Sequence, residues 1–162
     1  MTLTHVDDAG RARMVDVGGK PVTLRTATAE GWIRMGAEAI AMVEGNTGPK
    51  GAVLSTAELA GLSAAKRTAE LIPLCHQIPM DRIEVTARTE SEVPGVVVRA
   101  TAQAQWRTGV EMEALTAVSV ALLTVYDMVK AAGHDLEIGG IRLLEKSGGT
   151  RGNWALEQGS SA

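Results

Sequence analysis

The sequence predicts an α+β sandwich, in which one mostly antiparallel sheet has its helices packed on one face. Residues 81–90 and 95–106 alternate polar and apolar side chains, as strands do, on either side of a turn at Pro94 and Gly95. Residues 108–133 instead repeat apolar side chains every three or four positions, which indicates a long helix. Extended and helical segments follow one another irregularly, and this order favours an α+β architecture.

The N-terminal part predicts two extended segments and then a helix. Residues 11–27 alternate weakly on either side of a glycine pair, which indicates a turn between two extended segments. Residues 26–45 change to helical spacing, with Thr28 as the expected N-cap and Gly45 as the expected end.

Residues 51–74 predict a short strand followed by a second helix. The hydroxyl group of Thr56 is expected to cap this helix, and Pro73 is expected to stop it.

The long helix has signals at both of its ends. Thr108 and Glu111 have the spacing of a capping box, and Gly133 is a typical C-terminal signal. Residues 137–149 predict the last strand.

Length and composition indicate a single globular domain. The chain has 162 residues, and we expect one domain over residues 1–150 and a flexible tail over residues 151–162. The formal charge of −3 and the aromatic content of 2% argue against a nucleic-acid-binding protein. Cys75 is the only cysteine, so no intrachain disulfide can form. Neither a signal peptide nor a membrane span is expected, and together these features favour the cytoplasm.

The long helix carries two apolar faces. One face is formed by Leu115, Val118, Leu122, Val125 and Val129, and the other by Thr116, Val120, Leu123, Asp127 and Lys130. A helix with two apolar faces must bury both of them. The first face can pack on the sheet and the second on another subunit, so we expect an oligomer.

Asp127 and Lys130 lie three residues apart at the edge of the second face. They can form an ordinary surface ion pair, which contributes about 0.2–0.5 kcal/mol. They can also form a desolvated acid–base pair at a subunit interface, where burial tunes both pKa values. Their spacing leaves both interpretations open.

Other candidate residues are scattered along the chain. Cys75 and His76 lie in a segment stiffened by prolines, which suits presenting His76 to a ligand, although a buried connector would have the same sequence. Lys50 lies in a Gly/Pro loop that lacks the pattern of a phosphate loop, so it is a mobile cation or a solvated turn residue. No spacing of Cys and His indicates a zinc site. The remaining candidates are Asp16, Lys66, Arg67, Glu111, Glu113 and Lys146.

These residues together fit acid–base chemistry on a phosphorylated small molecule. Several long segments, "AGLSAAKRTAELIPLCHQIP", "TGVEMEALTAVSVALLTVYDMVKAA" and "RLLEKSGG" among them, resemble the cyclic pyranopterin monophosphate synthase family of molybdenum cofactor biosynthesis. The resemblance covers roughly residues 3 to 150 in the order of the family.

The resemblance implies a ferredoxin-like fold and a homohexamer, a trimer of dimers with active sites at the dimer interface. It also implies a lyase that converts 3',8-cyclo-7,8-dihydroguanosine triphosphate into cyclic pyranopterin monophosphate and pyrophosphate. No resident cofactor or metal ion is expected, and a Mg²⁺ ion accompanying the triphosphate is compatible with this expectation.

The resemblance further implies a role for individual residues. It assigns Asp127, Lys50 and Lys130 to catalysis, and it assigns substrate binding to Leu74, Cys75, His76, Met112, Glu113, Glu111, Lys66, Lys146 and Asp16. Lysines close to other cations are expected to have a lowered pKa, which would let them exchange protons near neutral pH.

Overall fold

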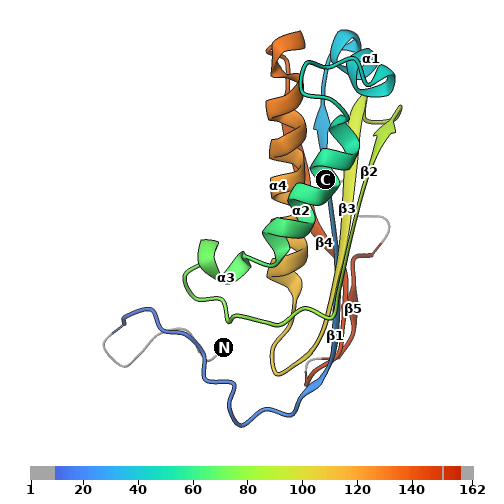
Figure 1. Cartoon of the computed structure of the whole chain (residues 1–162). Helices are drawn as coiled ribbons and strands as arrows, with labels where there is room; N and C mark the ends of the chain where they lie inside the picture. The colour runs from blue at the N-terminus through green and yellow to red at the C-terminus, as the bar shows by residue number, and fades with distance from the viewer. Residues whose placement is uncertain (1–9, 151, 158–162) are drawn as a thin grey trace.

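The described residues form one antiparallel sheet with helices on one face. The computed structural model describes residues 10–150 and 152–157. In this part of the chain the strands are β1 (Thr23–Arg34), β2 (Arg82–Glu90), β3 (Gly95–Trp106), β4 (Glu137–Ser147) and β5 (Trp154–Ala155). The helices are α1 (Ala37–Gly45), α2 (Val53–Ala65), α3 (Thr68–Leu71), α4 (Glu111–Val129) and the 3₁₀ turn η1 (Lys130–Ala132). Figure 1 shows α2 and α4 on one side of the sheet and α1 at the upper end of the strands.

The strand order confirms the predicted fold class. The sheet has the order β2-β3-β1-β4-β5, and every neighbouring pair is antiparallel. Helices connect β1 to β2 and β3 to β4, so the first four strands have the β-α-β-β-α-β arrangement of ferredoxin-like folds.

Small side chains let α4 lie close to the middle of the sheet. Ala27, Ala29 and Gly31 of β1 face the helices, and the alanines of β1 are fully buried. A Cβ atom added to Gly31 would lie 2.9 Å from Leu122 Cδ1 and 3.0 Å from Val118 Cγ1. The chain has almost no aromatic residues. Its core is therefore filled by small and aliphatic side chains in close contact and not by large aromatic rings.

The helix expected from Thr28 is wrong in its first part, because residues 23–34 form β1. Ala27, Ala29 and Ile33 alternate into the core, and β1 pairs with β3 on one side and β4 on the other. Small residues fit the helical and the extended pattern equally, so the pairing with two neighbouring strands decides the conformation. The helix itself begins only at Ala37.

Two expected helix starts are also wrong. The segment before α2 forms no strand, and Thr56 lies inside the helix, where its hydroxyl group donates to the Ala52 carbonyl oxygen at 2.7 Å. The N-cap of α4 is Val110, without a side-chain cap, so Glu111 is the first residue of the helix and not the third, as a capping box requires. The end of the helical segment at Gly133 is confirmed.

The two faces of α4 differ in exposure. Val118, Leu122, Val125 and Val129 are fully buried, which confirms the face that was predicted to pack on the sheet. On the second face Thr116 is buried, but Leu123 is 59% exposed. By length and composition the segment Glu111–Ala132 could cross a membrane, but 56% of its apolar window is buried in the fold, as in a core helix.

Strand β5 was not expected from the sequence. Trp154 pairs with Lys146 of β4, so part of the segment after residue 150 is ordered at the edge of the sheet. Residues 1–9, 151 and 158–162 lie outside the described residues.

Replacing Gly31 with valine is expected to destabilise the protein by about 1–3 kcal/mol, since the new side chain would overlap Leu122 and Val118. Thr86→Val on the exposed face of β2 is the matched control and should change the free energy of unfolding by less than about 0.5 kcal/mol. Urea denaturation measures both values, and equal stability of the two variants would contradict the close approach of α4.

Candidate active site

Lys50, Asp127 and Lys130 meet at the C-terminal end of α4. The Asp127 carboxylate accepts from Lys50 Nζ at 2.5 Å through Oδ2, and it lies 2.8 Å from Lys130 Nζ through Oδ1. Lys50 comes from the loop between α1 and α2 and also donates to the Asp127 carbonyl oxygen at 3.3 Å. The three residues that the resemblance assigned to catalysis therefore form one cluster, here named the Asp127 cluster.

The two lysines of the Asp127 cluster favour the ionised form of its carboxyl group in the single chain. Hydrogen bonds from Lys130 and then Lys50 lower the pKa of Asp127 to about 2. The hydrogen bond between Lys130 and Asp127 also raises the pKa of Lys130. This is opposite to the expectation that neighbouring cations would lower a lysine pKa, because the carboxylate between the two lysines dominates. About half of each side chain is exposed, so this chain alone does not desolvate the cluster.

A separate pocket of about 440 Å³ lies at the other end of α4. Most of the predicted binding residues line it, namely Leu74, Cys75, His76, Glu111, Met112, Glu113 and Lys146. The first three come from the segment between α3 and β2, the next three from the first turn of α4, and Lys146 from β4. The fold thus brings together three segments that are far apart in the sequence.

An ion pair crosses this pocket between α4 and the sheet. Lys146 Nζ donates to Glu111 Oε1 at 2.7 Å, and both side chains are mostly buried. The pair holds an ammonium group inside the pocket.

Glu113 is a buried carboxyl group in the pocket wall, with only 3% of the residue exposed. Burial raises the pKa of Glu113 to about 7, and the charge of Glu111 adds to the increase. Burial and then the charge of Glu113 raise the pKa of the Cys75 thiol. Glu113 can therefore hold or release a proton near neutral pH, whereas Cys75 is a poor nucleophile.

His76 connects the pocket to the N-terminal segment. Its Nε2 atom lies 2.8 Å from the carbonyl oxygen of Val15, and Val15 and Val17 also line the pocket. With the ring nitrogen as donor, this hydrogen bond fixes the orientation of the imidazole ring.

Two predicted binding residues lie outside the lining of the pocket. Asp16 is exposed, and its Oδ1 atom accepts from the backbone N–H of Gly18 at 2.8 Å. Lys66 is exposed at the C-terminal end of α2. Arg67, which the sequence offered as a cation, is also exposed and follows Lys66 directly.

The structure adds three cations that the sequence did not single out. Lys20, Arg25 and Arg107 line the pocket. Arg107 directly precedes the motif "TGVEMEAL", and this position was the only signal for it. Lys20 is brought to the pocket by the course of the segment before β1, and Arg25 by the first residues of β1, and the sequence pattern reveals neither placement.

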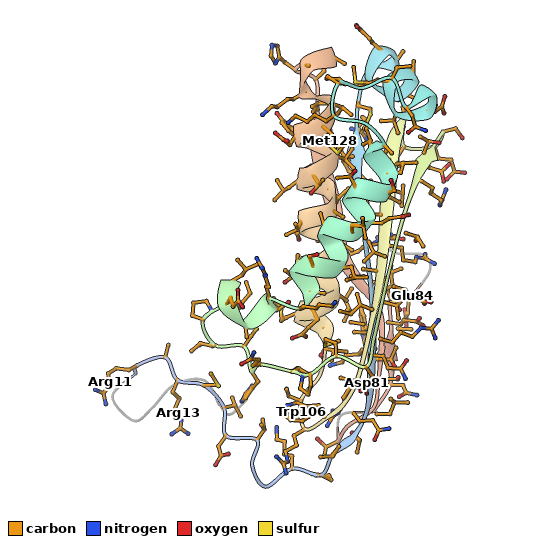
Figure 2. All side chains as sticks on the ribbon, viewed as in Figure 1. Arg11, Arg13, Asp81, Glu84, Trp106 and Met128 are labelled. Carbon is orange, nitrogen blue, oxygen red and sulfur yellow. The ribbon has the colours of Figure 1, made fainter. Side chains whose placement is uncertain are left out.

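The Asp127 cluster and the pocket are too far apart to act together in one chain. Glu113 and Asp127 are separated by 14 residues of α4, which corresponds to about 21 Å along the helix axis. Figure 1 shows the loop between α1 and α2 near the upper end of α4, and the segment before β1 below its lower end. In Figure 2 the labelled Met128 and Trp106 mark these two ends.

Metal ligands are not clustered in the part of the chain that the structure describes. No group of three or more His, Cys, Asp or Glu side chains there could hold an ion. The expectation of no resident metal or cofactor stays a prediction.

The raised pKa of Glu113 predicts a dependence of stability on pH. The folded state keeps a proton that the unfolded state releases above its ordinary pKa of 4.5, so stability falls as the pH rises through about 7. Relative to Glu113→Gln, the free energy of unfolding of the wild type should fall by up to about 3 kcal/mol between about pH 4 and pH 8. Denaturant titrations measure this difference, and a constant value would contradict the buried acid.

Comparisons with known proteins place these motifs in a family. The profile of the MoaC family matches residues 14–149. A cyclic pyranopterin monophosphate synthase of Brucella melitensis is 52% identical over 159 residues, which cover 98% of this chain and 96% of the relative. One of Brucella ovis is 53% identical over 154 residues (95% and 93%), and one of Cereibacter sphaeroides is 55% identical over 152 residues (94% and 96%). The chain therefore belongs to the MoaC family.

Proposed function

We propose that this chain catalyses the cyclic pyranopterin monophosphate synthase reaction of molybdenum cofactor biosynthesis. The substrate is (8S)-3',8-cyclo-7,8-dihydroguanosine 5'-triphosphate, and the products are cyclic pyranopterin monophosphate and pyrophosphate. Identity to enzymes of that name over nearly the whole chain supports this function. A biosynthetic step of this kind fits a cytoplasmic enzyme.

The active site is closed by two copies of the chain. The observation that carries this proposal is the separation of the Asp127 cluster from the pocket by most of the length of α4. If two α4 helices pack antiparallel about a two-fold axis, the Asp127 cluster of one copy lies beside the pocket of the other. The exposed Leu123 and Tyr126 on α4 are suitable contacts for such a dimer. Three such dimers make the hexamer that the family resemblance implies.

The pocket and the Asp127 cluster then have different chemical tasks. The reaction needs proton transfers on the ring and the sugar, followed by attack of a hydroxyl group on the α-phosphate. Glu113, with its pKa of about 7, can give or take a proton within the pocket. Asp127 stays ionised and orients the ammonium groups of Lys50 and Lys130. These cations stabilise the negative charge that develops as pyrophosphate leaves.

Covering the Asp127 cluster with the partner and the substrate would change its protonation. Removal of water disfavours the charged form of a lysine, so the raised pKa of Lys130 in the exposed cluster would fall on closure. Lys50 reaches Asp127 from a loop, so it can move with that loop toward the substrate.

Asp127→Asn is expected to lower turnover about 100-fold or more while the fold is kept, because the amide no longer holds the two lysines as a carboxylate does. Pyrophosphate release from the cyclic nucleotide measures turnover, and circular dichroism checks the fold. Near wild-type turnover of a folded variant would remove Asp127 from the mechanism.

Mixing two inactive variants tests whether the site is shared between copies. Asp127→Asn removes the cluster and Lys146→Ala removes a cation of the pocket, so a mixed dimer would contain one intact site and one doubly damaged site. Co-expression of the two chains should restore about a quarter of the wild-type activity, since about half of the dimers are mixed and each has one of two sites intact. Activity no higher than that of the separate variants would show that each site belongs to one chain.

A further inference from the structure

We infer that Lys20 and Arg107 form a phosphate clamp at the rim of the pocket, and that Asp16 acts as a positioning residue for Lys20. The clamp would hold the terminal phosphates of the substrate, which leave as pyrophosphate. This inference rests on the proposed function for the identity of its ligand.

Lys20 is presented by a turn that the sequence builds locally. The carbonyl oxygen of Val17 accepts from the backbone N–H of Lys20 at 3.0 Å. The carboxylate of Asp16 accepts from the N–H of Gly18 at 2.8 Å inside the same turn. An aspartate that binds the backbone two residues later is a common way to fix a turn. Asp16 thus touches the backbone that carries Lys20 and does not line the pocket itself.

The turn is anchored to the pocket wall. His76 bonds to the Val15 carbonyl oxygen at 2.8 Å, directly before the turn begins. Val15 and Val17 line the pocket together with Lys20, so this part of the N-terminal segment forms one wall. The anchor keeps Lys20 at the pocket although the segment forms no long strand there.

Arg107 is held at the same pocket from the β3–α4 connection. The guanidinium group of Arg25 donates to the carbonyl oxygens of Trp106 and Arg107, both at 3.4 Å. These bonds fix the backbone of the connection and leave the side chain of Arg107 exposed at the pocket.

The cations of the pocket divide into engaged and available groups. Lys146 is paired with Glu111, and Arg25 donates to backbone oxygens. Within residues 10–150 and 152–157, the ammonium group of Lys20 and the guanidinium group of Arg107 make no hydrogen bond or ion pair with the protein. Two exposed cations without a protein partner in the lining of an open pocket suit a polyanion whose leaving part must return to solvent.

Pyrophosphate binding to the intact protein, measured by titration calorimetry, tests the clamp directly. Lys20→Ala and Arg107→Ala should each weaken pyrophosphate binding about tenfold or more, since each removes charge-assisted hydrogen bonds to phosphate. Arg88→Ala removes a cation at the opposite end of the sheet and is the matched control, with unchanged affinity expected. Unchanged affinity in both clamp variants would overturn the inference.

A double variant tests the role given to Asp16. If Asp16 acts only by placing Lys20, Asp16→Ala should weaken pyrophosphate binding, and the Asp16→Ala/Lys20→Ala protein should bind no more weakly than Lys20→Ala alone. Additive losses would contradict this role, because they would mean that Asp16 contributes independently of Lys20. Rescue of the affinity by Lys20→Arg would show that the charge at this position matters.

The clamp and the proposed function fail in different ways. A wild-type protein that binds pyrophosphate through Lys20 and Arg107 but does not turn over the cyclic nucleotide would overturn the function and support an anion clamp. A wild-type protein that turns over the cyclic nucleotide, with clamp variants that keep both its KM and the affinity for pyrophosphate, would overturn the clamp alone.

Discussion

The close contact between α4 and β1 is the constraint on which the site depends. Gly31 has no room for a side chain below Leu122 and Val118, so the helix lies directly on the small residues of the sheet. Glu113 lies at the start of this helix and Asp127 at its end. The position of one rigid helix therefore sets the place of both groups of reactive side chains, and its length keeps them apart.

The same separation accounts for the different electrostatics of the two groups. At the start of α4 the side chain of Glu113 is buried by the fold itself, and its pKa is raised to about 7. At the end of α4 the Asp127 carboxylate is exposed between two lysines, and its pKa is lowered to about 2. One chain thus supplies an acid that is poised near neutral pH and a charge cluster that is not yet desolvated. A second copy would bring the two environments together.

The parts of the fold with a strong local pattern could be predicted from the sequence. Strands β2 and β3 alternate over a clear turn, and α4 has a complete apolar face, so both were identified. The part of β1 after residue 27 was expected to be helical because Ala, Thr and Gly satisfy both periods, and only pairing with two neighbouring strands decides between them. The starts of α2 and α4 were misplaced because no side chain caps either helix.

The candidate site was predictable where its residues are close in sequence or lie in recognisable motifs. Asp127 and Lys130 share one helix turn, and His76 and Glu113 lie in the longest motifs. Lys20 and Arg107 could not be found in this way, because only the folded chain brings them to one pocket.

A crystal structure of the assembled Asp127→Asn protein with the cyclic nucleotide bound would test the shared site most directly. The account predicts that one nucleotide contacts Glu113 or Lys146 of one copy and Lys50 of its partner. A nucleotide whose contacts all come from a single chain would contradict it.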